Sequence, residues 1–244
     1  MVSRRYSFIN SRRKTELEMP GIGLLNEKSL HASLKEWYAQ PGDRFEVSVD
    51  GFVIDIVRDG LLLEIQTGNF SSIKSKLTTL LKSHPVRLIY PVAREKWIVK
   101  QPLDNNGEAT RRKSPKKGRI EDLFGEMIRL PRLIKTPNFS LEVLLIKEDE
   151  LRRYDGKRNW RRKGWGIEER RLLEVVNRKL LNGLSDWQEL LPDLGASFTT
   201  KDLSDAAGIK MQLAQKMAYC FRQAGLIELV GKSGRAYLYS PTDA

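Results

Sequence analysis

The chain has 244 residues, with 43 Lys and Arg against 31 Asp and Glu, and a formal net charge of +12. This length allows one large domain or two modest ones, and the excess of positive charge favours polyanions as partners, nucleic acid first among them. The single Cys excludes an internal disulfide and a zinc site built from cysteines. No stretch approaches the ~18 apolar residues that span a bilayer. The basic N-terminus lacks the apolar core of a signal peptide, so we expect no membrane association and a cytoplasmic location.

The first hundred residues predict a helix, a three-stranded meander, a second helix and a further strand. Leu30, Leu34 and Trp37 fall at helical spacing, with Asn26 as the expected N-cap. Two Asp-Gly turns then join three short apolar runs. A helix that links two strands favours a parallel pairing at this end of the sheet. The predicted elements are a helix at 26–39, strands at 44–49, 52–58 and 61–67, a helix at 70–82 and a strand at 86–90.

The middle of the chain alternates between core elements and basic segments. Strands are predicted at 95–100 and 140–147, and a helix at 119–129. The segments at 101–118 and 151–166 lose hydrophobicity and gain positive charge, which suits phosphate contacts. The expected nucleic-acid-binding residues are Arg111, Arg112, Lys113, Lys116 and Lys117 in the first segment and Arg158, Arg161 and Arg162 in the second.

Two carboxylates interrupt apolar strands: Asp55 within residues 52–57 and Glu64 within residues 61–66. A charge inside a buried strand is costly unless it is paired or binds a metal. Because side chains alternate between the faces of a strand, Glu64 and Gln66 point the same way, and Asp55 joins them if the register allows. The pattern indicates a divalent-metal site. The alternative is that both acids line a solvated sheet face and do no chemistry.

The order of these elements, with acids on the second and third strands, resembles the PD-(D/E)XK (restriction-endonuclease-like) nuclease core over residues 26–100. The resemblance implies an αβββαβ fold around a mixed sheet. Asp55 matches the family's first acid, and Glu64-Ile65-Gln66 matches its acid-x-Lys element with Gln in place of Lys. It further implies that the two acids hold Mg²⁺ or Mn²⁺ through hard oxygen ligands, while Gln66 places the attacking water.

The resemblance leaves two roles to be filled. Gln66 carries no charge, so Lys74 or Lys76 from the next helix is expected to supply the positive charge that the family's Lys provides. His31 on the first helix is either a base or a packed or surface residue. The family often adds a metal-binding acid from the first helix, for which Glu27, ranked first, and Glu36 are candidates, and Glu46 on the first strand is a third.

The C-terminal elements have a different character. The apolar pattern predicts a helix at 167–182, a short helical element near Trp187, helices at 201–207 and 210–224, and strands at 227–230 and 236–239. Over about residues 167–241 this order resembles a winged helix-turn-helix domain. In such domains the second helix of the motif, here Met211 to Phe221, lies in the major groove. The expected DNA contacts are Lys210, Gln212, Gln215 and Lys216, with Lys232 and Arg235 on the wing.

Many winged helices instead dock proteins or dimerise, and fold analogy does not decide between these uses. The expected organisation is α/β with a C-terminal, mainly α winged-helix domain. Its parts are a basic arm at 1–25, a nuclease-like α/β domain at 26–150 with the basic insert at 101–118, a basic linker at 151–166 and the winged-helix domain at 167–244.

Two hypotheses of different classes follow. The first is a metal-dependent DNA endonuclease that a winged helix positions on DNA. The second is a non-catalytic DNA-binding regulator on a degenerate nuclease scaffold. Both predict DNA binding that weakens steeply with salt. RNA stays open as a target, and a homodimer is implied because double-strand cutting in this family usually needs two active sites.

Overall fold

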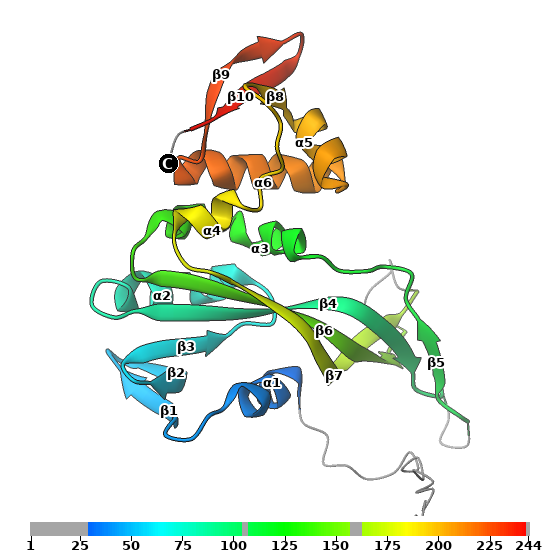
Figure 1. Ribbon diagram of the computed structural model, residues 1–244. Coiled ribbons are helices and arrows are strands. Elements are labelled where there is room, and N and C mark those ends of the chain that lie inside the picture. The colour runs from blue at the N-terminus through cyan, green and yellow to red at the C-terminus, as the bar shows by residue number, and fades with distance from the viewer. Residues whose placement is uncertain (1–28, 104–106, 157–162, 243–244) are drawn as a thin grey trace, which may run out of the picture.

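A large mixed sheet lies at the centre of the computed structural model, which describes residues 29–103, 107–156 and 163–242 (Figure 1). The strand order is β1-β2-β3-β4-β6-β7, and β5 pairs with β4. Strands β1 to β3 form an antiparallel meander, β4 is parallel to both β3 and β6, and β7 is antiparallel to β6. The predicted α/β class with a mixed sheet is therefore confirmed. The strands are β1 (Arg44–Val49), β2 (Phe52–Arg58), β3 (Leu61–Ile65), β4 (Val86–Lys100), β5 (Thr110–Lys113), β6 (Phe139–Tyr154) and β7 (Trp165–Leu181).

Helices cover both faces of this sheet (Figure 1). On one face α1 (Leu30–Tyr38) buries Leu34 against a cluster that includes Ile56 and Leu63. The other face carries α2 (Lys74–Leu80) and α3 (Phe124–Met127), with short 3₁₀ segments at Phe70–Ile73, Ile120–Leu123 and Pro131–Lys135. The Ser29 hydroxyl accepts a hydrogen bond from the N–H of Ala32 and caps α1. The predicted cap Asn26, the acid Glu27, the arm at 1–25 and Arg158, Arg161 and Arg162 lie outside the described residues.

The predicted helix at 167–182 is wrong. These residues form most of β7, which runs antiparallel along β6 and closes one side of the sheet in the described chain. The pairing of β6 with β7 shifts register at three places. Each shift breaks the two-residue alternation that identifies a strand, because an extra residue turns the following side chains to the other face. The segment therefore belongs to the large sheet and not to the C-terminal helices.

The remaining C-terminal elements follow the predicted order. They are α4 (Leu184–Gln188), β8 (Phe198–Thr199), α5 (Thr200–Ala207), α6 (Met211–Ala224), β9 (Ile227–Ser233) and β10 (Ala236–Pro241), and the three strands pair in the order β8-β10-β9. Thr199 and Asp202 cap α5 by reciprocal side-chain to backbone hydrogen bonds. Gly208 ends α5 with a φ of 60°, a conformation that suits glycine. Within the described ranges no helix has the length and apolar character needed to cross a membrane.

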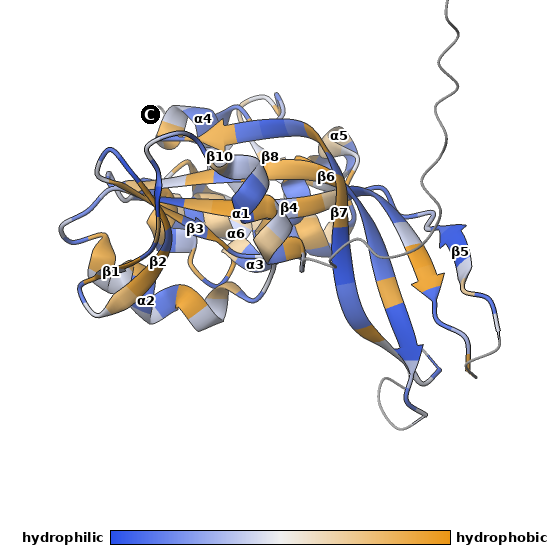
Figure 2. Cartoon of the chain, turned by 90° about the horizontal axis from the view of Figure 1, so that it is seen from below, coloured by the Kyte–Doolittle hydropathy of each residue, from blue (hydrophilic) through white to orange (hydrophobic). Residues whose placement is uncertain are grey.

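One continuous core joins these C-terminal elements to the sheet. The ring of Phe124 on α3 lies edge-on to Phe221 on α6, with centroids 5.2 Å apart, and 6.1 Å from Trp187 on α4. All three side chains are buried. Beyond this core, β4, β6 and β7 continue as a curved extension toward β5, where the residues are mostly hydrophilic (Figure 2). The C-terminal elements and the extension thus enclose a space on the α3 face of the sheet.

Candidate functional site: an acidic fork and a basic pocket

Asp55 and Glu64 lie where β2 and β3 separate, and we call this pair the acidic fork. Regular pairing of the two strands ends at Ile56 and Leu63. One residue further, Oδ2 of Asp55 accepts a hydrogen bond from the backbone N–H of Ile65 at 2.8 Å. The carboxylate of Glu64 lies close enough to Asp55 for the negative charge of Asp55 to raise its pKa. The Asp55 side chain therefore takes the place of a backbone acceptor between the two strands, next to Glu64.

His31 of α1 approaches the fork from one side. Its Nε2 lies 3.1 Å from Oδ2 of Asp55, whose side chain is 14% exposed. This hydrogen bond raises the pKa of His31 above its ordinary value and outweighs the opposing effect of partial burial. Burial pushes the pKa of Asp55 upward, but the hydrogen bonds from His31 and Ile65 and the nearby positive charge bring it below its ordinary value. Asp55 is therefore held as a carboxylate that His31 orients.

Lys76 of α2 approaches the same fork from the opposite face of the sheet. Its Nζ lies 2.5 Å from Oε1 of Glu64 and donates to the carbonyl oxygen of Val53 at 2.5 Å. Burial raises the pKa of Glu64 above its ordinary value, and the negative charge of Asp55 adds to this rise. Oε1 of Glu64 is buried and, within the described chain, receives no hydrogen bond of good geometry, so the ion pair with Lys76 is its contact.

The other residues predicted for this site lie apart from the two acids. Gln66 donates from Nε2 to the carbonyl oxygen of Asn69 and to Oγ of Ser72, both at 3.2 Å, and thereby closes the loop after β3. Lys74 is exposed at the first residue of α2. Of the further acids, Glu36 is exposed on α1, and Glu46 forms an ion pair with Lys35. Lys76 is thus the predicted helix lysine that the structure brings to the acids.

The donor set of the acidic fork fits a hard divalent cation. No group of three or more His, Cys, Asp or Glu side chains in the described ranges is arranged to hold a metal ion. Mg²⁺, however, often binds through only one or two carboxylates and keeps several waters. Two carboxylates on adjacent strands, one with a buried oxygen that no hydrogen bond satisfies, meet that requirement. A metal ion at Glu64 would take the place of the Lys76 ammonium.

The His31–Asp55 contact gives a measurable pH signature. Because the folded-state pKa of His31 is raised, the contact contributes fully to folding stability below pH 6.5. This contribution is lost as the pH rises through the folded-state pKa. The contribution of Asp55 to folding stability is present above pH 3.8 and is lost as the pH falls through the lowered folded-state pKa of this carboxyl group. In an NMR titration, with the two histidines distinguished by a His84→Asn variant, we expect the midpoint of His31 above 6.5 and a lower midpoint in Asp55→Asn. A midpoint at or below 6.5 in the unchanged protein would contradict the contact.

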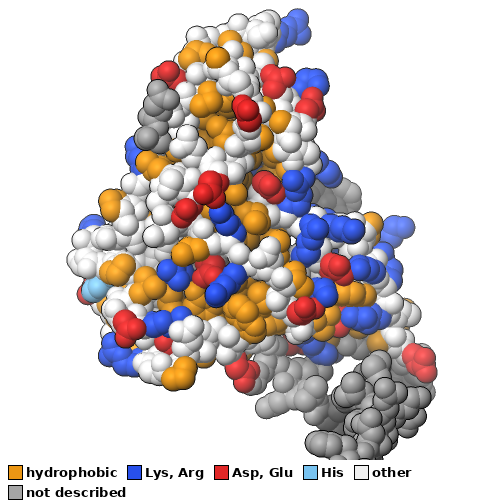
Figure 3. Space-filling view, in the orientation of Figure 1, with side chains coloured by type: hydrophobic (Ala, Val, Ile, Leu, Met, Phe, Trp, Pro, Cys, Tyr) orange, Lys and Arg blue, Asp and Glu red, His pale blue; other side chains and the backbone are white. Residues whose placement is uncertain are grey.

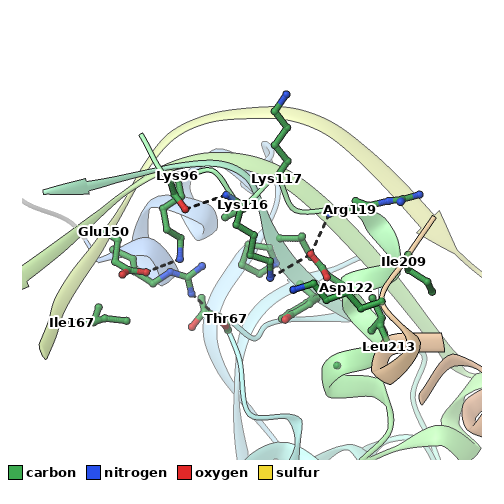
Figure 4. Close-up of a pocket in the computed structure, with 18 of the residues that line it drawn as sticks. Thr67, Lys96, Lys116, Lys117, Arg119, Asp122, Glu150, Ile167, Ile209 and Leu213 are labelled. Carbon is green, nitrogen blue, oxygen red and sulfur yellow. Dashed lines mark hydrogen bonds and ion pairs between the residues drawn. The ribbon is translucent and has the colours of Figure 1, made fainter. Parts of the chain in front are cut away.

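A second feature, the basic pocket, lies between the sheet, the loop after β5 and the start of α6 (Figure 4). Its volume is about 860 Å³. Thr67, one residue after Gln66, lines the pocket and places it beside the end of β3. Figure 3 shows Lys and Arg side chains gathered on this side of the molecule. The cationic lining residues are Lys96, Lys116, Lys117, Arg119, Arg152, Arg170, Lys210 and Lys216.

Buried acids hold the cations on the sheet side of this pocket. Glu148 is fully buried and accepts two hydrogen bonds from Arg170, at 2.6 and 3.0 Å, while Nζ of Lys96 lies 3.0 Å from its other oxygen. Glu150 is bound by Lys96 at 2.6 Å and by Arg152 at 2.6 Å. Bonds to Lys96 and Arg152 lower the pKa of Glu150 against the upward effect of its burial. The five side chains form one ionic network across β4, β6 and β7.

The predicted nucleic-acid-binding residues divide into three groups. Those that line the pocket are Lys116, Lys117, Lys210, Gln212 and Lys216. On β5, Arg111 and Lys113 form ion pairs with Asp149 and Glu95 and lie over the ring of Trp97, while Arg112 is exposed. Gln215 on α6 and Lys232 and Arg235 at the β9–β10 turn are exposed and lie outside the pocket.

Three pocket cations had no signal in the sequence interpretation: Lys96, Arg119 and Arg170. Lys96 lies in a strand predicted only from its apolar residues, and Arg170 lies in the segment predicted as a helix. Glu148, Glu150 and Arg152 stand two residues apart on β6. The strand predicted at 140–147 ends before these residues. If that strand were continued to residue 152, the two-residue spacing would place the three charges on one face.

Comparisons with known proteins place this chain in a family. The family model described as Domain of unknown function (DUF8091) matches residues 28–182, which run from just before α1 to just after the end of β7. An uncharacterized protein of Treponema pallidum (strain Nichols) is 33% identical over 222 residues, which cover 89% of this chain and 86% of that protein. No solved structure matches the chain. The match over more than half of the chain shows that this protein belongs to the DUF8091 family.

Proposed function

We propose that this protein is a metal-dependent DNA endonuclease built on a PD-(D/E)XK-like core and positioned on DNA by a winged helix-turn-helix unit. The observation that carries the proposal is the acidic fork. Two carboxylates from adjacent strands meet there, and Lys76 from the following helix reaches the same point. This is the combination of hard oxygen ligands and a nearby cation that phosphodiester hydrolysis uses.

The order and pairing of the elements support both parts of the proposal. Elements α1 to β4 follow the αβββαβ order, with β1 to β3 antiparallel and β4 parallel to β3. In the C-terminal part, the strand order β8-β10-β9 around α5 and α6 fits a winged helix, with β9 and β10 as the wing.

Each residue of the fork has a distinct role in this proposal. Asp55 and Glu64 would hold Mg²⁺ or Mn²⁺, which polarises a phosphate and lowers the pKa of a water. Lys76, released from Glu64, offsets the negative charge that develops on the phosphate. His31 holds Asp55 in orientation through its hydrogen bond. Gln66 fixes the loop that connects β3 to α2 and so positions Lys76 indirectly.

Cleavage of supercoiled plasmid and single-stranded DNA tests the proposal. With Mg²⁺ or Mn²⁺, we expect cleavage by the unchanged protein and a loss of about 100-fold in Asp55→Asn and Glu64→Gln, because each removes a charged oxygen ligand that would hold the metal ion, and the positive charge of that ion stabilises the transition state. Glu228→Gln, an equal change at an exposed residue of β9, should cleave normally. Equal cleavage by all four proteins would rule out the fork as the active site.

The alternative is a DNA-binding regulator that keeps the nuclease scaffold without catalysis. Two observations favour it: the amide nitrogen of Gln66 is engaged within its own loop, and Lys76 is held by Glu64 and the carbonyl of Val53. In the same experiment, DNA binding without cleavage under any divalent cation would favour the regulator over the nuclease.

A further inference from the structure

The basic pocket carries more positive charge than its own acids can neutralise. Eight Lys and Arg side chains line it, against two acids, Asp122 and Glu150. Both acids are already engaged, Glu150 by Lys96 and Arg152 and Asp122 by Lys116 at 3.7 Å. Glu148 beneath the lining and Glu121, 3.2 Å from Arg119, compensate two more cations. Four of the eight positive charges remain, so the pocket suits a ligand with several negative charges.

The cations on the sheet side are fixed before any ligand arrives. Lys96, Arg152 and Arg170 are held by Glu148 and Glu150, which are buried beneath them. Side chains that are already ordered lose less conformational entropy when they bind a ligand. This arrangement differs from a surface of free lysines, because a phosphate would meet cations in set positions.

The two walls of the pocket are joined to each other. Arg119, in the loop before α3, donates to the carbonyl oxygen of Gly208 at 2.7 Å, and so ties this loop to the turn between α5 and α6. Gly118 packs against the backbone of β4, where an added Cβ would come within 2.3 Å of the carbonyl oxygen of Ala93. These contacts set the width of the pocket between the loop and α6.

We infer that the basic pocket binds one single strand of DNA through its phosphates, an inference that rests on the proposed function for the choice of DNA. A volume of about 860 Å³ is roughly that of a cube 10 Å on a side, whereas the major groove of B-DNA alone is ~12 Å wide and the whole duplex is wider still, so a duplex does not fit inside the pocket. Apolar residues of the lining that keep some exposure, among them Ile167, Ile209 and Leu213, offer surface to sugars and bases. Arg170 donates to the carbonyl oxygen of Thr67 at 3.2 Å, which links the pocket to the end of β3 and the acidic fork.

Fluorescence anisotropy with a labelled oligo-dT strand in EDTA tests the pocket independently of metal and cleavage. The pocket variant Lys116→Gln/Lys210→Gln removes one exposed cation from each wall. The matched control Lys82→Gln/Lys135→Gln removes the same charge from exposed positions that do not line the pocket. We expect about tenfold weaker binding and a shallower salt dependence, by about 1.4 in slope, for the pocket variant only.

Three results would overturn the inference: no binding by the unchanged protein, equal weakening in both variants, or a duplex competitor that displaces the strand as well as an unlabelled strand does. If no protein cleaves DNA but the pocket variant still binds oligo-dT more weakly than the control variant, only the proposed nuclease is refuted. If the protein cleaves DNA but the two lysine variants bind oligo-dT equally well, only the inference that the pocket binds the strand is refuted.

Discussion

Replacing Glu148 with Ala should lower the free energy of unfolding by about 3 kcal/mol, because breaking a buried ion pair leaves its partners without compensation. Glu148 is fully buried and binds both Lys96 and Arg170. This loss is at the lower end of the ~3–5 kcal/mol expected for a broken buried pair, because the side chains of Lys96 and Arg170 are 27% and 24% exposed and regain some hydration. Urea unfolding followed by circular dichroism measures the change.

Glu174→Ala is the matched control for this prediction. Glu174 forms an ion pair with Lys147 on the same two strands, but its side chain is 54% exposed. Exposed pairs of this kind contribute between about 0 and 1 kcal/mol. If Glu148→Ala also changed stability by less than about 1 kcal/mol, the ionic network would not be a structural support of the pocket.

Replacing Phe124 with Ala should cost about 3–5 kcal/mol, because it empties a fully buried aromatic site at the junction of the sheet layer and the C-terminal elements. The ring of Phe124 contacts Phe221 and Trp187. Since the core is continuous across this junction, we expect tryptophan fluorescence and circular dichroism to report one coincident unfolding transition, shifted as a whole.

Phe45→Ala controls for the residue type. Phe45 lies on β1 with 46% of its surface exposed, and its loss should cost less than about 1 kcal/mol. Two separate transitions in the unchanged protein, of which Phe124→Ala moves only one, would mean that the C-terminal elements unfold independently of the sheet.

Local signals in the sequence were sufficient for the small elements. Each of the Asp-Gly turns, at residues 50–51 and 59–60, has two consecutive residues with positive φ, and these turns join β1 to β2 and β2 to β3. Thr199 and Gly208 mark the two ends of α5 by capping chemistry that depends on neighbours in sequence alone. These features could be predicted because their causes lie within a few residues.

The long strands could not be predicted in full because their cause lies elsewhere in the chain. β6 is stabilised as a strand by β4 and β7 on either side, so its charged half at 148–152 stays extended despite its composition. For the acidic fork, the pattern identified Asp55 and Glu64 and offered Lys76 as one of two lysines. It did not anticipate that α1 would bring His31 to Asp55, since that contact depends on how α1 packs on the sheet.

The position of β7 at the end of the large sheet has a consequence for self-association. Among the described residues no strand pairs with the outer edge of β7, which is 17 residues long, and such an edge offers a row of backbone donors and acceptors to another extended chain. β7 carries charged residues at seven of these positions, namely Glu168, Glu169, Arg170, Arg171, Glu174, Arg178 and Lys179. Charged side chains on an edge discourage the sheet from growing into a neighbouring molecule. The charges that stand among the apolar positions of this segment therefore help to keep the sheet from templating aggregation.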